Sequence, residues 1–367
     1  MEEERIEVTK KDILKHYIAS IVIYGFVLLF IIFCPILGSN IENTSFNYMK
    51  FFFIYYIAYI IFAYPIFLKF KPKSILHSHN IAIIEYIKRQ FNKNESIEQW
   101  LKNIEPFENE KQAMMILFMK TFFGVLCVTE LCNKYIPSLD YNISFLREMF
   151  SQAVLYTGTN GIVEGIAQYI DDTADMWLNF ITMFITIILA ISYLTDLDLF
   201  KNKIKSVDTT PLGVLTCIMC YYPITILSNR IIISYTEELI PVPNLGLRLF
   251  LNISVLLINI ISLLAIARLG TKAGNLTNRG IVTKFPYNIV RHPNYSMQIF
   301  YLILTTIPLY FISDLTILDK VLYSVGTIGW IYIYYLRAIT EERHLIKDSE
   351  YQQYTEKVKY RFIPKLF

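Results

Sequence analysis

Apolar runs long enough to cross a membrane alternate with short polar segments along the whole chain. A membrane-spanning helix needs about 20 mostly apolar residues, and about eight candidate spans meet that rule. These spans cover residues 17–37, 51–69, 113–132, 176–194, 212–228, 246–267, 297–312 and 321–339. The pattern predicts an all-α, polytopic membrane bundle of about eight transmembrane helices, without a Rossmann sheet.

Two longer segments between the spans are less apolar, and we expect both to form surface loops. Residues 70–112 carry apolar positions at helical spacing, which is typical of an amphipathic helix on a membrane surface. Residues 133–175 are acidic to neutral and should lie on the opposite side of the membrane. Within them, the run from Gly158 to Gly165 lacks the spacing of a dinucleotide-binding loop, so we interpret it as a turn that opens a helix.

The distribution of charge predicts the orientation of the chain. Lysine and arginine collect in the N-terminal tail, in alternate loops and in the C-terminal tail. Because cytoplasmic loops collect positive charge, both termini should lie in the cytoplasm. The first apolar segment is too long for the core of a signal peptide, and we expect it to be retained. The net charge of +3 is too small to suggest a nucleic-acid partner.

Composition narrows the possible chemistry. Hydrophobic residues make up 54% of the chain, and the 13 glycines argue against a glycine-rich nucleotide loop. Cys217 and Cys220 have the spacing of a metal or redox site, but they lie in an apolar span without a second pair. Lys120 lies well inside a predicted span. A functional role and a side chain that extends to the membrane surface both remain open for it.

Two polar motifs flank the last pair of predicted spans. The first motif runs from Tyr287 to Tyr295 (YNIVRHPNY), and the second runs from Arg337 to Leu345 (RAITEERHL). Ionisable groups beside a bilayer are costly to place without a use. Either motif alone has a structural explanation, since Arg337 and Glu341 have the spacing of a helix ion pair. Together, on the same side of a helical pair, the motifs favour a functional site.

The C-terminal quarter of the chain carries a recognisable set of residues. They are Gly280-Ile-Val-Thr, Tyr287, Arg291-His-Pro-Asn-Tyr295, Glu341-Glu342-Arg-His-Leu345, Tyr351-Gln-Gln-Tyr354 and the Ile363-Pro364 ending. Their order and spacing resemble the isoprenylcysteine carboxyl methyltransferase and phospholipid methyltransferase superfamily of integral-membrane enzymes. The resemblance covers about the last 90 residues and divides the chain into an N-terminal scaffold (1–245) and a methyltransferase-like region (246–367).

The resemblance implies that S-adenosylmethionine is bound at the cytoplasmic face, and it assigns roles to particular residues. Arg337 matches an arginine that holds the carboxylate of the methyl acceptor, with Arg291 and Glu342 beside it as further catalytic candidates. The implied acceptor is a lipidic or prenylated molecule that enters from the bilayer. The implied cofactor-binding residues are Ile281, Val282, Tyr287, His292, Pro293, Asn294, Tyr295 and Glu341.

The chemistry of the cofactor agrees with these residue types. Its sulfonium is already an activated methyl donor, so the protein must mainly align donor and acceptor and exclude water. A carboxylate acceptor needs no general base, and a guanidinium can orient it with two hydrogen bonds. An amine acceptor needs a proton acceptor, for which Glu342 is the candidate. We expect O-methylation more than N-methylation.

Two other hypotheses remain open. The run Arg291-His-Pro-Asn-Tyr295, with its Asn294, also resembles related membrane reductases that use NADPH to saturate a sterol or enone double bond. The basic tail suits the 2′-phosphate of that cofactor. The adjacent carboxylates of Glu341 and Glu342 argue against a polyanionic cofactor. Alternatively, the chain is a non-catalytic homologue, because Phe285 and Met297 stand where the family has glycine.

Overall fold

The computed structural model describes residues 7–33, 48–91, 105–196, 202–233, 242–311 and 315–366. Most of this chain is helical, and β1 and β2 pair as a short ribbon. The helices are α1 (Lys10–Phe33), α2 (Tyr48–Phe70), α3 (His79–Gln90), α5 (Glu108–Glu130), α6 (Leu139–Asn160), α7 (Ile162–Leu194), α8 (Pro211–Ile218), α9 (Ile224–Ile231), α10 (Leu245–Leu269), α11 (Pro293–Thr306), α12 (Ile317–Leu345) and α13 (Ser349–Lys357). Shorter elements are η2 (Lys73–His77), the π-helical η3 (Leu131–Tyr135), η5 (Gly270–Lys272), η6 (Ile307–Phe311), β1 (Ser206–Val207) and β2 (Thr277–Asn278).

Within the described residues, 5 helices are long and apolar enough to cross a membrane: α1, α2, α5 with η3, α7 and α10. The prediction of an all-α protein is confirmed, whereas the count of about eight spans is not. The single span expected over residues 212–228 is divided into α8 and α9, each 8 residues long, with Pro223 at the start of the second. Proline lacks the amide donor that a continuous helix needs at this point.

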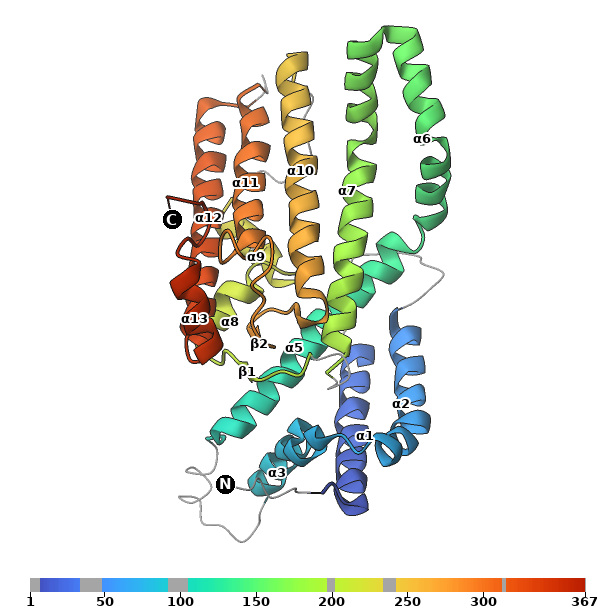
Figure 1. Ribbon diagram of the computed structural model, residues 1–367, viewed down its shortest axis with the longest axis vertical. Coiled ribbons are helices and arrows are strands. Elements are labelled where there is room, and N and C mark those ends of the chain that lie inside the picture. The colour runs from blue at the N-terminus through green and yellow to red at the C-terminus, as the bar shows by residue number, and fades with distance from the viewer. Residues whose placement is uncertain are drawn as a thin grey trace.

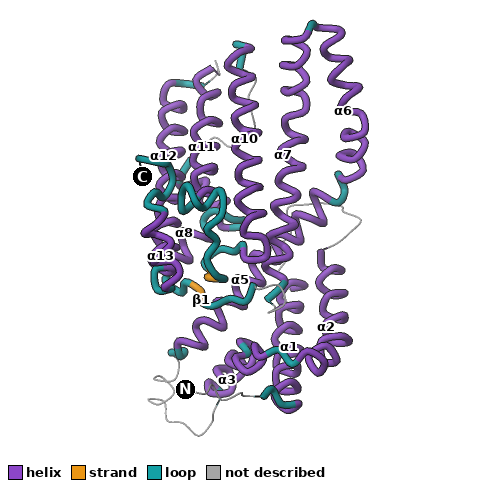
Figure 2. The backbone as a smooth tube through the Cα atoms, in the orientation of Figure 1, coloured by secondary structure: helices purple, strands orange, loops and turns teal. Residues whose placement is uncertain are grey.

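The long helices form an elongated bundle (Figure 1). Helices α7, α10, α11 and α12 run side by side, while α5 crosses below them and α1, α2 and α3 lie toward the other end of the long axis. The tube in Figure 2 shows how much of the loop structure gathers near the lower ends of α10, α11 and α12. The C-terminal helix α13 lies beside this region. The first motif runs into the start of α11 and the second forms the end of α12, so this region holds both polar motifs.

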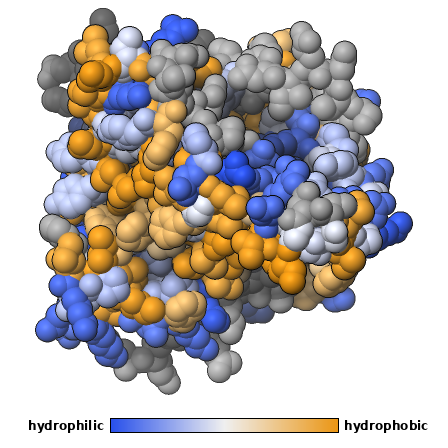
Figure 3. Space-filling view, turned by 90° about the horizontal axis from the view of Figure 1, so that it is seen from above, coloured by the Kyte–Doolittle hydropathy of each residue, from blue (hydrophilic) through white to orange (hydrophobic). Residues whose placement is uncertain are grey.

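Many large apolar side chains are exposed on these helices. Seen from above, apolar residues cover a broad area across the middle of the molecule (Figure 3). On α2, 23 residues long, the only residues buried are Tyr48 and Ala63. Exposed apolar surface of this extent is typical of contact with lipid, and it indicates a membrane protein.

Part of the segment 133–175, expected as a surface loop, is a helical hairpin. Helix α6 ends at Asn160, Gly161 adopts a φ of 83°, and α7 begins at Ile162. The interpretation of the glycine-rich run as a turn that opens a helix is confirmed. Gly165 allows the two helices to meet, because a Cβ atom there would lie 2.4 Å from the backbone oxygen of Tyr156.

The short ribbon joins the N-terminal helices to the polar motifs. Strands β1 and β2 are antiparallel, with Val207 opposite Thr277. The side chain of Gln112 on α5 extends this ribbon, since it accepts from the amide of Val207 (2.7 Å) and donates to its carbonyl (2.9 Å). On the other side, Asn278 donates to Asp348 at 2.9 Å. The ribbon thus holds the segment before the first motif against the end of α12.

Candidate functional site

One cavity of about 560 Å³ lies where the ends of α7, α10 and α12 meet the segment between η5 and α11. Every residue predicted to bind the cofactor lines it: Ile281, Val282, Tyr287, His292, Pro293, Asn294, Tyr295 and Glu341. Arg291 and Arg337 line it as well, whereas Glu342 does not. The tertiary structure thus brings both motifs, about 50 residues apart in sequence, to one partly open cavity.

The C-terminal tail holds the first motif in place. The amide of Arg291 donates to the carbonyl of Tyr360 (2.9 Å), and the amide of His292 donates to that of Arg361 (3.0 Å). The hydroxyl of Ser296 donates to the carbonyl of Phe362 at 2.8 Å. Pro293 then begins α11, where its missing amide costs no hydrogen bond. These contacts fix the backbone at His292, whose side chain lines the cavity.

Glu342 is the centre of a buried ion cluster. Its Oε1 lies 3.1 Å from His292 Nε2 and 3.2 Å from Arg291 Nε, and its Oε2 accepts from Arg361 Nε at 2.8 Å. The Glu342 side chain is 10% exposed, so the cluster is largely removed from water. Its contacts join α12, the start of α11 and the C-terminal tail.

The pKa of Glu342 disfavours the role of proton acceptor that the sequence suggested. Burial acts to raise this pKa, but the hydrogen bond with His292, the charge of His292 and the contacts with Arg361 and Arg291 outweigh it. The pKa therefore lies below its ordinary value. A carboxylate with a lowered pKa is a weaker base, and this one has no face on the cavity.

Glu341, which precedes Glu342 on α12, is more exposed and lies outside the ion cluster. Its Oε2 accepts a hydrogen bond from the hydroxyl of Tyr295 at 2.8 Å and lies 3.8 Å from His292 Nδ1. The Glu341 side chain is 35% exposed and lines the cavity. Of the paired carboxylates, Glu341 is therefore the one that can receive a ligand.

Arg337 is buried against aromatic rings and not paired with Glu341. The ion pair that their spacing suggested is not among the ion pairs of the described residues, in which no carboxylate contacts Arg337. Its Nη2 donates to Asn275 Oδ1 at 2.8 Å, and its guanidinium lies 4.9 Å from the ring centre of Tyr295. The rings of Tyr221 and Tyr334 lie 5.6 Å and 5.7 Å away. A guanidinium buried in this way can receive an anionic group from the cavity.

An aromatic cluster forms another wall. Tyr287, Tyr351 and Tyr354 pack with Ile281 and Val282, and the hydroxyl of Tyr354 donates to the carbonyl of Tyr287 at 2.6 Å. Burial raises the pKa of all three phenols, which keeps them neutral at pH 7. This wall offers flat apolar surface of the kind that an aromatic ligand group can stack on.

Several polar atoms along the cavity have no partner within the described part of the chain. They are Ser262 Oγ, Thr277 Oγ1, Tyr351 Oη, and Nε and Nη2 of Arg279. Buried polar atoms are rarely left without a hydrogen bond. Arg279 also donates to carbonyls of α7 and of the following segment, among them Ser192 at 2.9 Å. Sequence reasoning missed Ser262, Thr277 and Arg279, because only the fold turns them toward one space.

The two departures from the family pattern do not obstruct this cavity. Neither Phe285 nor Met297 lines it. The Phe285 side chain is exposed, and its carbonyl accepts a hydrogen bond from Arg268 at 3.0 Å. No protein-family model, curated protein or solved structure matches this chain.

Proposed function

We propose that the chain is a membrane methyltransferase that transfers a methyl group from S-adenosylmethionine to a lipidic or isoprenoid-linked acceptor. The proposal includes about eight membrane spans, both termini in the cytoplasm and the cavity at the cytoplasmic face. The observation that carries it is the meeting of both motifs in one cavity whose buried polar atoms lack partners. The resemblance in sequence suggests the reaction class, and the cavity that both motifs line supports the proposal.

The residues present fit the cofactor. A cavity of about 560 Å³ falls within the roughly 300–1,000 Å³ of small-molecule sites. Glu341 is suited to hold the ammonium group, the unpartnered donors suit polar oxygens, and the tyrosine cluster suits the adenine. When bound, the cofactor supplies an activated methyl group on its sulfonium. The protein residues then hold the reactants in line and exclude water.

The lining charges favour an anionic acceptor. Cationic side chains outnumber acidic ones: Lys134, Lys272, Arg279, Arg291 and Arg337 against Glu130 and Glu341. Arg337 can orient a carboxylate with two hydrogen bonds, as guanidinium groups commonly do. Since Glu342 is a poor proton acceptor, the arrangement supports a carboxylate acceptor, which needs no base, over an amine.

The test is calorimetric titration of the purified chain with S-adenosylmethionine. We expect saturable binding that weakens at least about tenfold in Glu341→Gln, because a hydrogen bond with a charged group contributes about 1.5–3 kcal/mol. Glu356→Gln, at an exposed position on α13, is the matched control and should bind like the parent. Absence of saturable binding, or undiminished binding by Glu341→Gln, would contradict the proposal. Mass analysis of co-purified lipids for a gain of one methyl then identifies the acceptor.

A second candidate function is an NADPH-dependent reductase of the same superfamily. The observation that favours it is the excess of cationic side chains along the cavity, which suits a polyphosphate. The objection from adjacent carboxylates is also weaker, because the guanidinium groups of Arg291 and Arg361 offset the charge of Glu342. The two functions are separated by which nucleotide raises the melting temperature, and a non-catalytic homologue would respond to neither.

A further inference from the structure

A second hollow lies apart from the methyltransferase-like cavity, between α1, α2, η2, α3, α5 and the segment after α7. It consists of a polar chamber of about 350 Å³ and a smaller aromatic chamber of about 90 Å³. The chambers adjoin, since both are lined by Tyr24, Tyr55, Tyr59, Leu117, Lys120 and Leu194. Tyr193, which is 1% exposed, lines both the aromatic chamber and the methyltransferase-like cavity and forms a wall between them.

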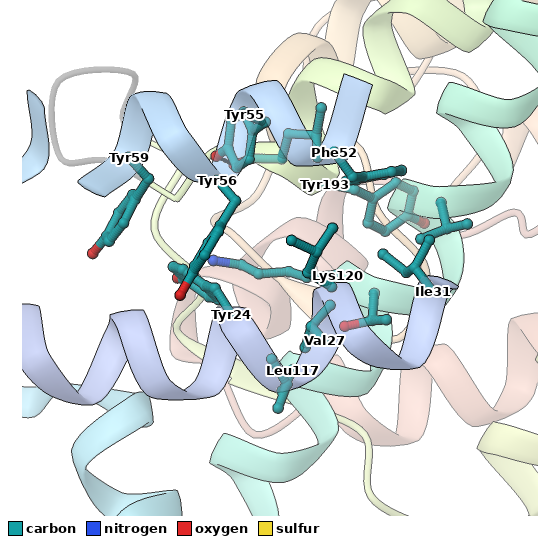
Figure 4. A pocket seen from close by; sticks show the side chains of 14 residues that line it. Tyr24, Val27, Ile31, Phe52, Tyr55, Tyr56, Tyr59, Leu117, Lys120 and Tyr193 are labelled. Carbon is teal, nitrogen blue, oxygen red and sulfur yellow. Dashed lines mark hydrogen bonds between the residues drawn. The ribbon is translucent and has the colours of Figure 1, made fainter. Parts of the chain in front are cut away.

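The aromatic chamber is apolar along most of its length (Figure 4). Val27 and Ile31 on α1 and Phe52 on α2 line one part, and Lys120 extends from α5 toward Tyr24 and Tyr56. The hydroxyl of Tyr56 donates to a backbone carbonyl of α1 at 3.0 Å, so its ring is held as a wall. A small chamber with such apolar walls suits a hydrocarbon chain.

The polar chamber carries an excess of positive charge. Lys120 Nζ lies 2.9 Å from Asp196 Oδ2, so this lysine forms a largely buried ion pair. Lys203 lines the same chamber, and no ion pair of the described residues includes it. The imidazoles of His77 and His79 line it as well and can donate hydrogen bonds. Two lysines thus face a single aspartate.

Exposed lysines surround the nearby ends of α1 and α2. They are Lys10, Lys11, Lys15, Lys69, Lys71 and Lys73. Of these, Lys15 pairs with Glu85 (2.9 Å) and Lys71 with Glu7 (3.9 Å). A rim with this excess of positive charge attracts anionic headgroups, which basic pockets between membrane helices bind.

We propose that this hollow binds one anionic phospholipid. Its phosphate lies in the polar chamber beside Lys203 and the histidines, and an acyl chain lies in the aromatic chamber. A phosphate group in the polar chamber could come from a phospholipid or from free inorganic phosphate. Only the phospholipid also has an acyl chain, so binding experiments can distinguish the two. The site shares one lining residue, Tyr193, with the methyltransferase-like cavity, and none of its charged residues lines that cavity. It does not depend on the proposed reaction.

The test uses the full chain, purified in an uncharged detergent and freed of lipid, with the melting temperature as the measurement. Short-chain phosphatidylglycerol should raise the melting temperature saturably, whereas phosphatidylcholine of the same chain length and inorganic phosphate should not. Lys203→Gln should weaken the response at least about tenfold, because it removes a charged hydrogen-bond donor. Ala58→Trp places a large side chain in the polar chamber and should abolish the response.

Lys88→Gln is the matched control, since this lysine is exposed on α3 and lies outside the hollow. Three outcomes would overturn the proposal: an equal response to phosphatidylcholine, saturation by phosphate alone, or an unchanged response in both cavity variants. S-adenosylmethionine binding should persist in Lys203→Gln and Ala58→Trp. If the parent chain does not bind S-adenosylmethionine, only the proposed function is contradicted, and the phospholipid site is not.

Discussion

The exchange of Glu342 for glutamine is the sharpest test of how the C-terminal region is held together. Glutamine preserves the size of the side chain but removes the negative charge from the ion cluster. It also turns one acceptor oxygen into a donor, which would face groups that donate themselves. Arg291 and His292, whose side chains are 13% and 5% exposed, would lose their common partner.

The expected loss of stability follows from the burial of each contact. Removal of one partner from a buried ion pair costs about 3–5 kcal/mol, whereas an exposed pair contributes about 1 kcal/mol or less. The Arg361 side chain is 35% exposed and can regain water, so the cost arises mainly from Arg291 and His292. We therefore expect a loss of about 3 kcal/mol. For 367 residues, with an unfolding entropy of about 2.1 cal/mol/K per residue, this lowers the melting temperature by about 4 °C.

The assay is thermal unfolding in detergent, with Glu341→Gln as the neighbouring control. Glu341 is half-buried and makes one hydrogen bond at 2.8 Å, so its exchange should cost about 1 kcal/mol. Binding of S-adenosylmethionine should show the opposite order, with Glu341→Gln impaired and Glu342→Gln retained. Equal melting temperatures for the two variants would refute the assignment of a structural role to one carboxylate and a binding role to the other.

The remaining predictions concern the helical hairpin, the ribbon and the stability of the protein at low pH. Gly165→Ala forces a Cβ atom against the backbone of α6. It should lower the free energy of unfolding by about 3 kcal/mol, measured by thermal unfolding. The control Gly158→Ala, whose added Cβ atom meets nothing within 4 Å, should leave stability unchanged or raise it. Gln112→Ala leaves both backbone groups of buried Val207 unpaired and should cost about 2 kcal/mol, measured by denaturation. Because the folded pKa of Glu342 lies below its unfolded value of 4.5, its contribution is present above pH 4.5 and is lost as the pH falls through the folded pKa. Asp196 and Asp348, whose pKa values are also lowered, keep their own acid dependence. A pH series of melting temperatures should therefore show a larger acid-dependent loss in the parent than in Glu342→Gln.

Hydrophobic runs were enough to predict most of the long helices. Spans 17–37, 51–69, 113–132, 176–194 and 246–267 correspond to α1, α2, α5, α7 and α10, because an uninterrupted apolar run satisfies its backbone only within a helix. The run 212–228 is shorter and contains Pro223, and it divides into α8 and α9 at the turn that includes this proline. Part of the polar segment 133–175 became a helical hairpin, since helix formation there depends on packing between α6 and α7.

The sequence by itself determined which residues gather at the site, because the two motifs carry costly polar groups at the ends of apolar helices. The tertiary structure decided which partners each of these residues contacts. Glu341 and Glu342 are chemically identical neighbours, about 100° apart around α12. The packing of α11 and the C-terminal tail against that helix turned one into the cavity and enclosed the other among cations. No local pattern encodes that difference, because it depends on contacts with residues far away in the chain.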